Sequence, residues 1–497
     1  MLAPGKDPLI LGEESVKKLF REFVCQIPSP FLGRDLSISD KMVLATAEDF
    51  TAKNLLLDGN VTLCSEGGKG EESMGKRERS WEKLDNTANI FPVIASDQMT
   101  NTYRISCCLK ELVDAETLQE AVDLVTPRFP GFHVRLRRGV FWYYLEENHK
   151  PAPRVKEEHA YPCRLIHTSR NNSYLFRVSY FRDRINLEVF HALADGVGAI
   201  GFLREIVYQY LRLAHEELRR EGDGLSPETS LDREDAFLRN YRRAHKNQYK
   251  SGKAYLIRGR KLPADAMGVF HGYMSLGQIR EVARNRYGVS INEYLIAAYV
   301  WAVYREDYHR LVRSGRPLRV AVPVNLRPFF ASETTKNFFV MVSAEFLPQK
   351  EDYSFAEIAG MIHKSLRSQI TRENLEAIFS YNVSNQDYLA ARAVPLPLKN
   401  LAMRFIYNRT AAANTTTITN IGNISVEDKY RSYIRAFHCF LAFSRGQGLK
   451  ATITSYQDTL VFSVSSRWEG TGIQRDIFRQ IARDGIELAL ECNGGNE

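Results

Sequence analysis

The chain has 497 residues, of which 44% are hydrophobic and 25% are charged, so it is long enough for two or more folded domains and is not a disordered chain. The net charge of +8 and the isoelectric point near 9.0 favour acidic partners, such as a phosphate-bearing cosubstrate or an anionic membrane. Because the charges form no single block, the alternative is that they serve solubility alone. No zinc-finger or RNA-recognition pattern occurs, which argues against a nucleic-acid partner.

The seven cysteines are odd in number and none has CxxC spacing, which is typical of a reduced chain with free thiols. The N-terminus lacks the apolar region of a signal peptide. The longest apolar stretch, residues 294–304, is shorter than the roughly 20 residues that cross a bilayer. These features predict a cytoplasmic protein without a transmembrane segment, for which peripheral contact with a membrane stays open.

Residues 1–80 differ in composition from the rest and are expected to be an N-terminal extension. Gly, Ser, Glu and Lys crowd residues 65–80, which predicts a flexible linker. Met74 directly precedes the first regularly patterned segment and is an alternative start of translation. On that hypothesis, residues 1–73 are dispensable.

Residues 81–215 alternate between strand and helix patterns. Asp114 is a candidate N-cap, and the apolar residues that follow it at helical spacing predict a helix. A second helix is expected over residues 197–213. The expected strands occupy residues 101–109, 132–144 as a hairpin about Arg138–Gly139, 174–180 and 185–191.

Residues 216–260 are polar and are expected to connect this first half to a second half over residues 261–490, before a tail at 491–497. Thr471 and Gln474 form a candidate capping box for a last helix that ends at Leu490. Further helices are expected over residues 276–287, 291–308 and 355–370, and strands over 318–324, 415–421, 436–444, 449–456 and 459–466. The interleaving of strands and helices predicts an α/β or α+β class.

The segment from Ile185 to Gly196 carries the clearest chemical signal. Strand alternation places His191 on the same face as apolar residues of its strand, at the inner end. A neutral imidazole there suits a general base, because its ordinary pKa near 6.5 is matched to proton transfer at neutral pH. The alternatives are a hydrogen-bonded core histidine and, for Asp195, a plain helix N-cap.

His191-Ala-Leu-Ala-Asp195-Gly196 resembles the HxxxDG motif of the chloramphenicol acetyltransferase-like acyltransferase superfamily, which includes alcohol acetyltransferases, wax ester synthases and condensation domains. Residues 322–328 (VPVNLRP) and 419–422 (TNIG) are similar to two later segments of that superfamily, in the right order. The resemblance covers residues 81–490 and is closest to the alcohol acetyltransferase-like branch, whose opening segment residues 81–92 resemble. The DFGWG segment of the plant branch is absent.

The resemblance implies two chloramphenicol acetyltransferase-like subdomains with mixed sheets and a central tunnel. It also implies transfer of an acyl group, above all acetyl, from coenzyme A to an alcohol or amine. His191 would take the proton of the acceptor and pass it to the leaving thiolate, without a covalent enzyme intermediate. Acyl-CoA is then a cosubstrate rather than a bound cofactor, and no set of side chains has metal-ligand spacing.

Other residues acquire expected roles from the same resemblance. Asp195 would pair with an arginine and hold the loop, with Arg327 as one candidate, and Gly196 would permit a tight turn. The remaining candidates line the tunnel or donate to the oxyanion, although threonines in a run are also simply strand formers; they are Thr417, Thr419, Asn420, Asn325 and Asn337.

Three other functions stay open at this point. A carrier-protein-dependent condensation or acyl-transfer enzyme would share the histidine but receive its donor on a phosphopantetheine arm. A catalytically inactive member would act as a binding protein. A wax ester or glyceride synthase would differ in the length of the acyl chain.

Overall fold

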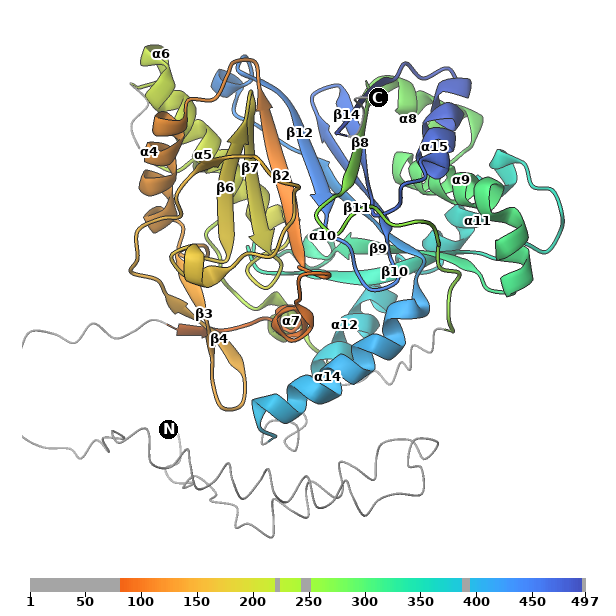
Figure 1. Cartoon of the computed structure of the whole chain (residues 1–497), viewed down its shortest axis with the longest axis horizontal. Coiled ribbons are helices and arrows are strands. Elements are labelled where there is room, and N and C mark those ends of the chain that lie inside the picture. Colours follow the sequence, from red (N-terminus) through yellow and green to blue (C-terminus); the bar gives the residue numbers. More distant parts are fainter. Residues whose placement is uncertain (1–80, 220–223, 243–251, 387–393, 494–497) are drawn as a thin grey trace, which may run out of the picture. The chain divides into compact units, whose positions relative to one another are not determined.

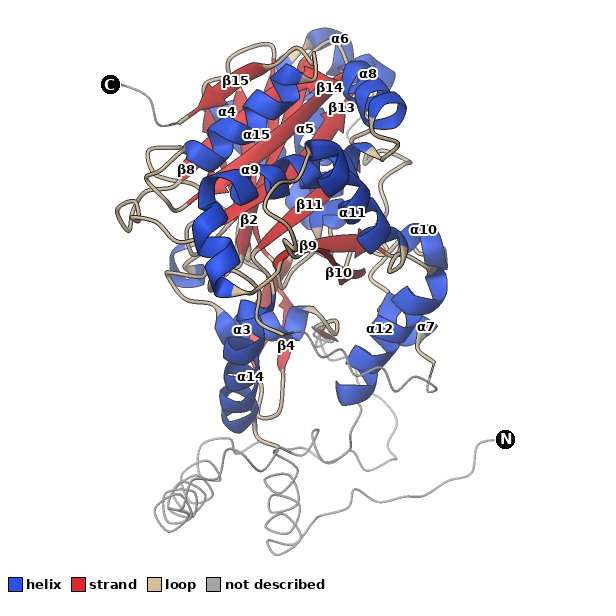
Figure 2. Cartoon of the chain, turned by 90° about the vertical axis from the view of Figure 1, so that its right-hand side faces the viewer, coloured by secondary structure: helices blue, strands red, loops and turns tan. Residues whose placement is uncertain are grey.

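The computed structural model describes residues 81–219, 224–242, 252–386 and 394–493, all of which belong to the unit Arg79–Glu497. The predicted extension, its linker and Met74 lie outside the described residues. Within these residues, strands form three sheets, and helices cover the outer faces of the two larger ones (Figures 1 and 2).

The first large sheet has five strands, four from the first half of the described chain and one, β12, from near its end. Helices α4 (Ala115–Val125) and α5 (Gly196–Ala214) cover one face of it and share its apolar core. Asp114 caps α4 by accepting a hydrogen bond from the backbone N–H of Thr117, as its position in the sequence predicts. The strand order is β12 (Ile434–Leu441), β2 (Thr102–Leu109), β7 (Arg184–Phe190), β6 (Phe176–Phe181) and β5 (Lys156–Glu157).

The second large sheet has seven strands and is mixed, because β11 runs parallel to both of its neighbours. Helices α9 (Ile291–Ser314), α11 (Phe355–Arg367) and α15 (Gly472–Arg483) pack on its outer face in a second core. The order is β10 (Phe339–Phe346), β9 (Leu318–Asn325), β11 (Thr416–Asn423), β13 (Leu449–Tyr456), β14 (Thr459–Ser466), β8 (Gly268–Ser275) and β15 (Ala489–Cys492).

The smaller elements connect or flank these layers. A three-stranded sheet has the order β1 (Trp81–Lys83), β4 (Tyr143–Glu147) and β3 (Val134–Arg138), and its β3–β4 hairpin extends to one end of the molecule (Figure 1). The other α-helices are α3 (Phe91–Ile94), α6 (Glu216–Arg219), α7 (Ala236–Asn240), α8 (Leu276–Glu281), α10 (Arg327–Phe330), α12 (Arg372–Gln386) and α14 (Leu396–Thr410).

Strand β12 joins the two large sheets. It follows β11 in the chain but pairs with β2 of the five-stranded sheet, from Ile434 opposite Leu109 to Leu441 opposite Tyr103. Its backbone also accepts hydrogen bonds from threonines of β13, including one of 2.8 Å from the Thr454 hydroxyl to the Phe437 carbonyl. The two sheets are therefore joined by the chain crossing from β11 to β12 and by these hydrogen bonds, as well as by packing.

The predicted class is confirmed, whereas the C-terminal end of the chain differs from the prediction. The last helix ends at Arg483, not at Leu490, because Gly485 adopts a left-handed conformation and the chain then pairs with β8 as β15. The predicted capping box at Thr471 does not form, since the Thr471 side chain makes no capping hydrogen bond. Among the described residues, no helix is long and apolar enough to cross a bilayer.

Candidate active site

His191 lies directly after β7, where its backbone N–H donates to the carbonyl of Asn101 at 2.9 Å. Aromatic rings from three separate elements surround its imidazole. Phe91 at the start of α3 stacks on it with ring centroids 4.6 Å apart, and Tyr103 of β2 lies at 4.9 Å. Phe339 of β10 completes the enclosure at 5.8 Å. The imidazole is therefore positioned by residues from both halves of the chain.

Asn337 and Asp85 fix the orientation of the imidazole. The Asn337 amide nitrogen donates to the Asp85 carboxylate at 2.9 Å and to the His191 carbonyl at 3.3 Å. The amide oxygen of Asn337 therefore faces His191 Nδ1, at 3.1 Å. An oxygen can only accept here, so the network assigns the proton to Nδ1 and leaves Nε2 with a free lone pair.

Burial lowers the pKa of His191 below its ordinary value of 6.5. A backbone hydrogen bond, the Asp195 carboxylate and the Asn337 contact oppose this shift, and the positive charge of Lys450 adds a minor lowering. The imidazole is therefore neutral at pH 7. A neutral ring with an accepting Nε2 has the protonation state that a general base requires.

Asp195 and Arg327 form a buried ion pair beside this histidine. Two guanidinium nitrogens of Arg327 donate to the two carboxylate oxygens of Asp195, at 2.8 and 3.1 Å. Arg327 also donates to the carbonyls of Thr334 and Lys336. Asp195 in turn accepts from the backbone N–H groups that open α5 and, at 3.1 Å, from that of Phe338. The pair thus ties the loop after His191 to the second half of the chain.

Two glycines at the start of α5 make close approaches. A Cβ on Gly198 would lie 2.2 Å from the backbone oxygen of Thr335, which is impossible without moving the backbone. A Cβ on Gly196 would lie 2.7 Å from the end of the Ile421 side chain, which can move more readily. The steric requirement for glycine is therefore stronger at position 198, which the motif does not include.

The other predicted site residues lie on the strands and turns of the second half. On β11, Ile418 faces the core, so Thr417 and Thr419 lie on the opposite face, the one that brings Ile421 to Gly196. The Thr417 hydroxyl donates to Gln447, whereas among the described residues the Thr419 hydroxyl has no hydrogen-bond partner. Two asparagines serve the backbone, since Asn420 accepts from the N–H of Gly422 and Asn325 from that of Arg327.

A cavity of about 270 Å³ lies beside the first two turns of α5. Its wall also includes residues 228–230, 333–335, 421 and 423–425. Arg204 lines it, and the Nε of this buried side chain has no hydrogen-bond partner within the described ranges. The cavity therefore has both polar and apolar walls and adjoins the loop that follows His191.

Lys450 is a buried cation that no sequence motif indicates. It lies on β13 with 6% of its surface exposed, and its ammonium group donates to the Ser444 hydroxyl at 2.6 Å. Across the part of the chain that is described, it forms no ion pair with a carboxylate. Burial therefore lowers its pKa from 10.5 to about 8.

Replacement of Lys450 by methionine is expected to raise the free energy of unfolding at pH 7 by about 3 kcal/mol, because it removes an uncompensated buried charge. The native chain itself should gain stability between pH 8 and 10.5, where the folded lysine is neutral while the unfolded lysine still binds a proton. The advantage of the variant should shrink over the same interval. Urea unfolding at pH 7 and pH 10 measures this, with exposed Lys110→Met as control; a variant less stable than native at pH 7 contradicts it.

Sequence reasoning missed several residues of this site. Asp85 and Phe91 belong to the opening segment quoted for the resemblance, but nothing in that segment predicts contact with Asn337 or with the imidazole. Tyr103 was assigned only to a strand, and its hydroxyl lies 2.9 Å from the carbonyls of both Ala194 and Asp195. Strand alternation alone places Tyr103 on a buried face, which is the only local signal for it.

No protein-family model matches the sequence, and no curated protein matches it significantly. Solved structures do match. TRI101 of F. graminearum, complexed with coenzyme A and deoxynivalenol, aligns with a TM-score of 0.54 and 11% identity over 82% of this chain and 99% of its own. Polyketide synthase associated protein 5 from Mycobacterium tuberculosis aligns at 0.52, with 15% identity over 80% and 96%. Trichothecene 15-O-acetyltransferase TRI3 from Fusarium sporotrichioides aligns at 0.51, with 12% identity over 83% and 96%.

Proposed function

We propose that this chain, which has the mixed α/β fold of the two-subdomain chloramphenicol acetyltransferase-like acyltransferases and condensation domains, is a CoA-dependent O- or N-acyltransferase. Residues 81–215 and 261–490 form its two halves, and donor and acceptor meet at His191. One observation carries the proposal: aromatic rings from both parts of the chain enclose the imidazole, and Asn337 engages its Nδ1, so that Nε2 is the nitrogen left to accept a proton. The complex of TRI101 with coenzyme A supports the choice of donor.

In the proposed reaction, His191 Nε2 accepts the proton of the acceptor hydroxyl or amine while the acceptor atom attacks the thioester carbonyl carbon. The tetrahedral intermediate then collapses, the carbon–sulfur bond breaks, and the imidazolium returns the proton to the thiolate. The ester or amide and free coenzyme A leave. The histidine thus ends in its starting state, and no acyl-enzyme forms.

Thr419 is the proposed donor to the oxyanion of that intermediate. Its hydroxyl is unpartnered within the described segments, whereas that of Thr417 is committed to Gln447. Removal of a single oxyanion donor typically costs about 10²–10³-fold in kcat. Asp195 and Arg327 do not touch the reacting atoms in this scheme and act by holding the loop.

The test is turnover of acetyl-CoA with a panel of alcohols and amines, followed by mass spectrometry of the acylated product. We expect His191→Ala to reduce kcat/KM by about 10²–10⁴-fold, the usual contribution of a general base. His159→Ala, at a histidine whose side chain is 79% exposed, is the matched control and should keep full activity.

The possible outcomes separate the candidate functions. Activity that survives in His191→Ala removes the histidine from its proposed role. A native chain that uses acyl groups only on a phosphopantetheinylated carrier protein is a condensation-type enzyme. A chain that binds the acceptor but turns over neither donor is a binding protein. A preference for long-chain acyl-CoA over acetyl-CoA identifies a wax ester or glyceride synthase.

A further inference from the structure

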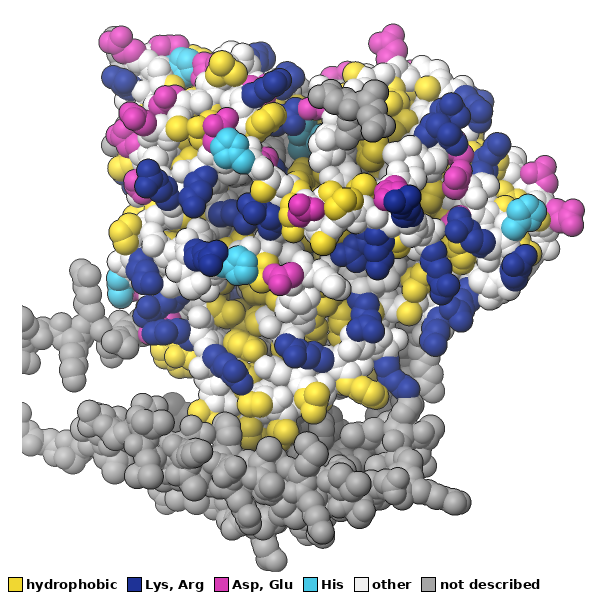
Figure 3. Space-filling model, viewed as in Figure 1, with side chains coloured by type: hydrophobic (Ala, Val, Ile, Leu, Met, Phe, Trp, Pro, Cys, Tyr) yellow, Lys and Arg dark blue, Asp and Glu magenta, His cyan; other side chains and the backbone are white. Residues whose placement is uncertain are grey.

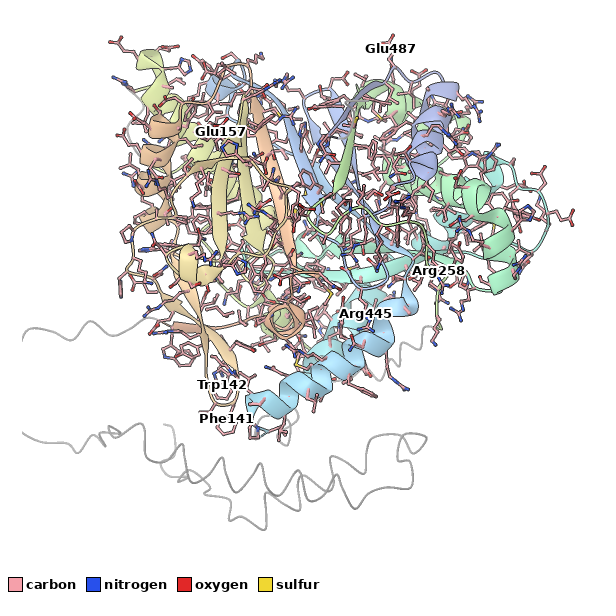
Figure 4. The ribbon with its side chains drawn as sticks, viewed as in Figure 1. Phe141, Trp142, Glu157, Arg258, Arg445 and Glu487 are labelled. Atoms are coloured by element: carbon pink, nitrogen blue, oxygen red, sulfur yellow. The ribbon has the colours of Figure 1, made fainter. Side chains whose placement is uncertain are left out.

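The turn of the β3–β4 hairpin exposes three consecutive apolar side chains. Val140 is 64% exposed, Phe141 37% and Trp142 41%. The two aromatic residues lie at the extreme tip of the hairpin, on the same side of the molecule as one end of α14 (Figure 4). None of the three residues belongs to a hydrophobic core cluster of the described chain.

Helix α14 continues this apolar surface. The Leu396 backbone N–H donates to the Val140 carbonyl at 2.8 Å, and the Asn400 side chain donates to the Tyr143 hydroxyl at 2.9 Å. The helix therefore lies against the hairpin. Along it, further apolar side chains are at least two-fifths exposed, namely Leu398, Leu401, Phe405 and Ile406. We call residues 140–142 together with these four the hairpin–α14 surface.

Basic residues outnumber acidic ones around these apolar side chains. Residues 134–145 and 394–413 together contain six Lys and Arg and no Asp or Glu. Glu146, which follows the first range, pairs with Arg135 and Arg137, so the excess positive charge at the hairpin tip comes from Arg138. Arg138 and Arg404 are exposed among them. In the space-filling view, yellow and dark blue side chains mingle over this end of the molecule, where magenta ones are sparse (Figure 3).

We propose that the hairpin–α14 surface docks onto an anionic lipid bilayer, with Phe141, Trp142, Leu401 and Ile406 entering the headgroup region. Exposed aromatic and aliphatic side chains gain free energy when they leave water for the interface, and tryptophan favours that depth. Nearby arginines add attraction to anionic headgroups, about 1 kcal/mol each near the surface. A protein partner would need an apolar face with an excess of acidic groups. An anionic bilayer combines an apolar interior with negative headgroups.

The surface is linked to the proposed active site through α3. Arg404 on α14 donates from Nε to the Val93 carbonyl of α3 at 2.7 Å, and Phe91 at the start of α3 stacks on His191. If the proposed acyl transfer holds, docking would place the imidazole near a source of apolar acceptors or acyl chains. The docking itself does not depend on that function.

The experiment is sedimentation of the full chain with vesicles of phosphatidylcholine alone or mixed with phosphatidylserine. We expect the native chain to bind the mixed vesicles more tightly and to release them as salt rises. A fourfold variant should bind the mixed vesicles with a partition coefficient at least about tenfold lower. It replaces Phe141, Trp142, Leu401 and Ile406 together by serine. The matched control replaces exposed apolar residues on other elements by serine, namely Leu112, Phe181, Val312 and Leu490, and should bind like the native chain.

Two further variants keep the test decisive if the fourfold variant folds poorly. Arg138→Gln should weaken binding about fivefold on mixed vesicles and leave binding to phosphatidylcholine unchanged. Trp142→Phe should remove most of the blue shift in tryptophan emission that mixed vesicles produce in the native chain. A native chain that binds neither vesicle, or a folded fourfold variant that binds like native, overturns the proposal. Because binding is measured without substrates, a failure of the acyltransferase assay leaves this result intact.

Discussion

Replacement of Arg327 by leucine is expected to lower the free energy of unfolding by about 3–5 kcal/mol, because it leaves the Asp195 carboxylate buried without its cation. The guanidinium also satisfies the carbonyls of Thr334 and Lys336, which the leucine would leave without these donors. Urea unfolding at pH 7 measures the change. Acyl transfer should fall as well, since Asp195 anchors both the start of α5 and the backbone of Phe338.

Two variants show whether charge or geometry dominates. Arg327→Lys keeps the charge but cannot form the bidentate contact, so it should recover only part of the lost stability. Arg327→Leu combined with Asp195→Leu removes both charges and should be more stable than Arg327→Leu alone. If the free energy of unfolding of Arg327→Leu lies within about 1 kcal/mol of that of the native chain, the ion pair does not hold the loop in solution.

Replacement of Asp85 by asparagine is expected to lower kcat by about 10²–10⁴-fold without lowering stability. Without the carboxylate, the Asn337 amide can rotate and present its nitrogen to His191 Nδ1. That contact favours the tautomer that carries its proton on Nε2. A protonated Nε2 cannot accept the proton of the acceptor substrate. Burial raises the pKa of Asp85 to about 6, so the ionised carboxylate lowers the free energy of unfolding by about 3 kcal/mol at pH 7. The neutral amide of asparagine should therefore leave the free energy of unfolding equal or higher.

Nitrogen NMR of the His191 ring separates this role from a merely structural one. In the native chain the protonated nitrogen should be Nδ1, and in Asp85→Asn a substantial share of the proton should move to Nε2. Asp123→Asn, at an exposed carboxylate of α4, is the control for the substitution itself. An unchanged tautomer together with unchanged kcat would show that Asp85 does not orient the histidine.

Patterns within single segments predicted the elements whose apolar residues face one core. Helix α4 and strand β7 are examples: α4 has one buried apolar face, and in β7 the alternating Ile185, Leu187 and Val189 all lie in the same core. Strands β8 and β10 were not predicted. Histidine and glycine interrupt the apolar pattern of β8, and methionine and glutamate interrupt that of β10. Helix α14 was not predicted either, because its apolar residues point in all directions and several of them are exposed rather than buried.

The active site was predictable where a residue lies within one motif and not where the contact joins distant segments. His191 and Asp195 follow from spacing in a single stretch of chain. The link from Asp85 through Asn337 to His191 joins three stretches, and periodicity carries no information on which of them meet. Lys450 is similar, since its strand predicts a buried face but not that a cation occupies it without a carboxylate partner.

Strand β12 has a consequence for how the chain can fold during synthesis. The five-stranded sheet has β2 and β7 available early, yet the edge of β2 stays unpaired until β12, which lies far downstream, has left the ribosome. At roughly 5–20 residues per second, that interval is on the order of ten seconds or longer. During it, an exposed strand edge can pair with another nascent chain. A gene cut between the halves would thus yield a first fragment that aggregates, and its rescue would require a peptide that supplies β12.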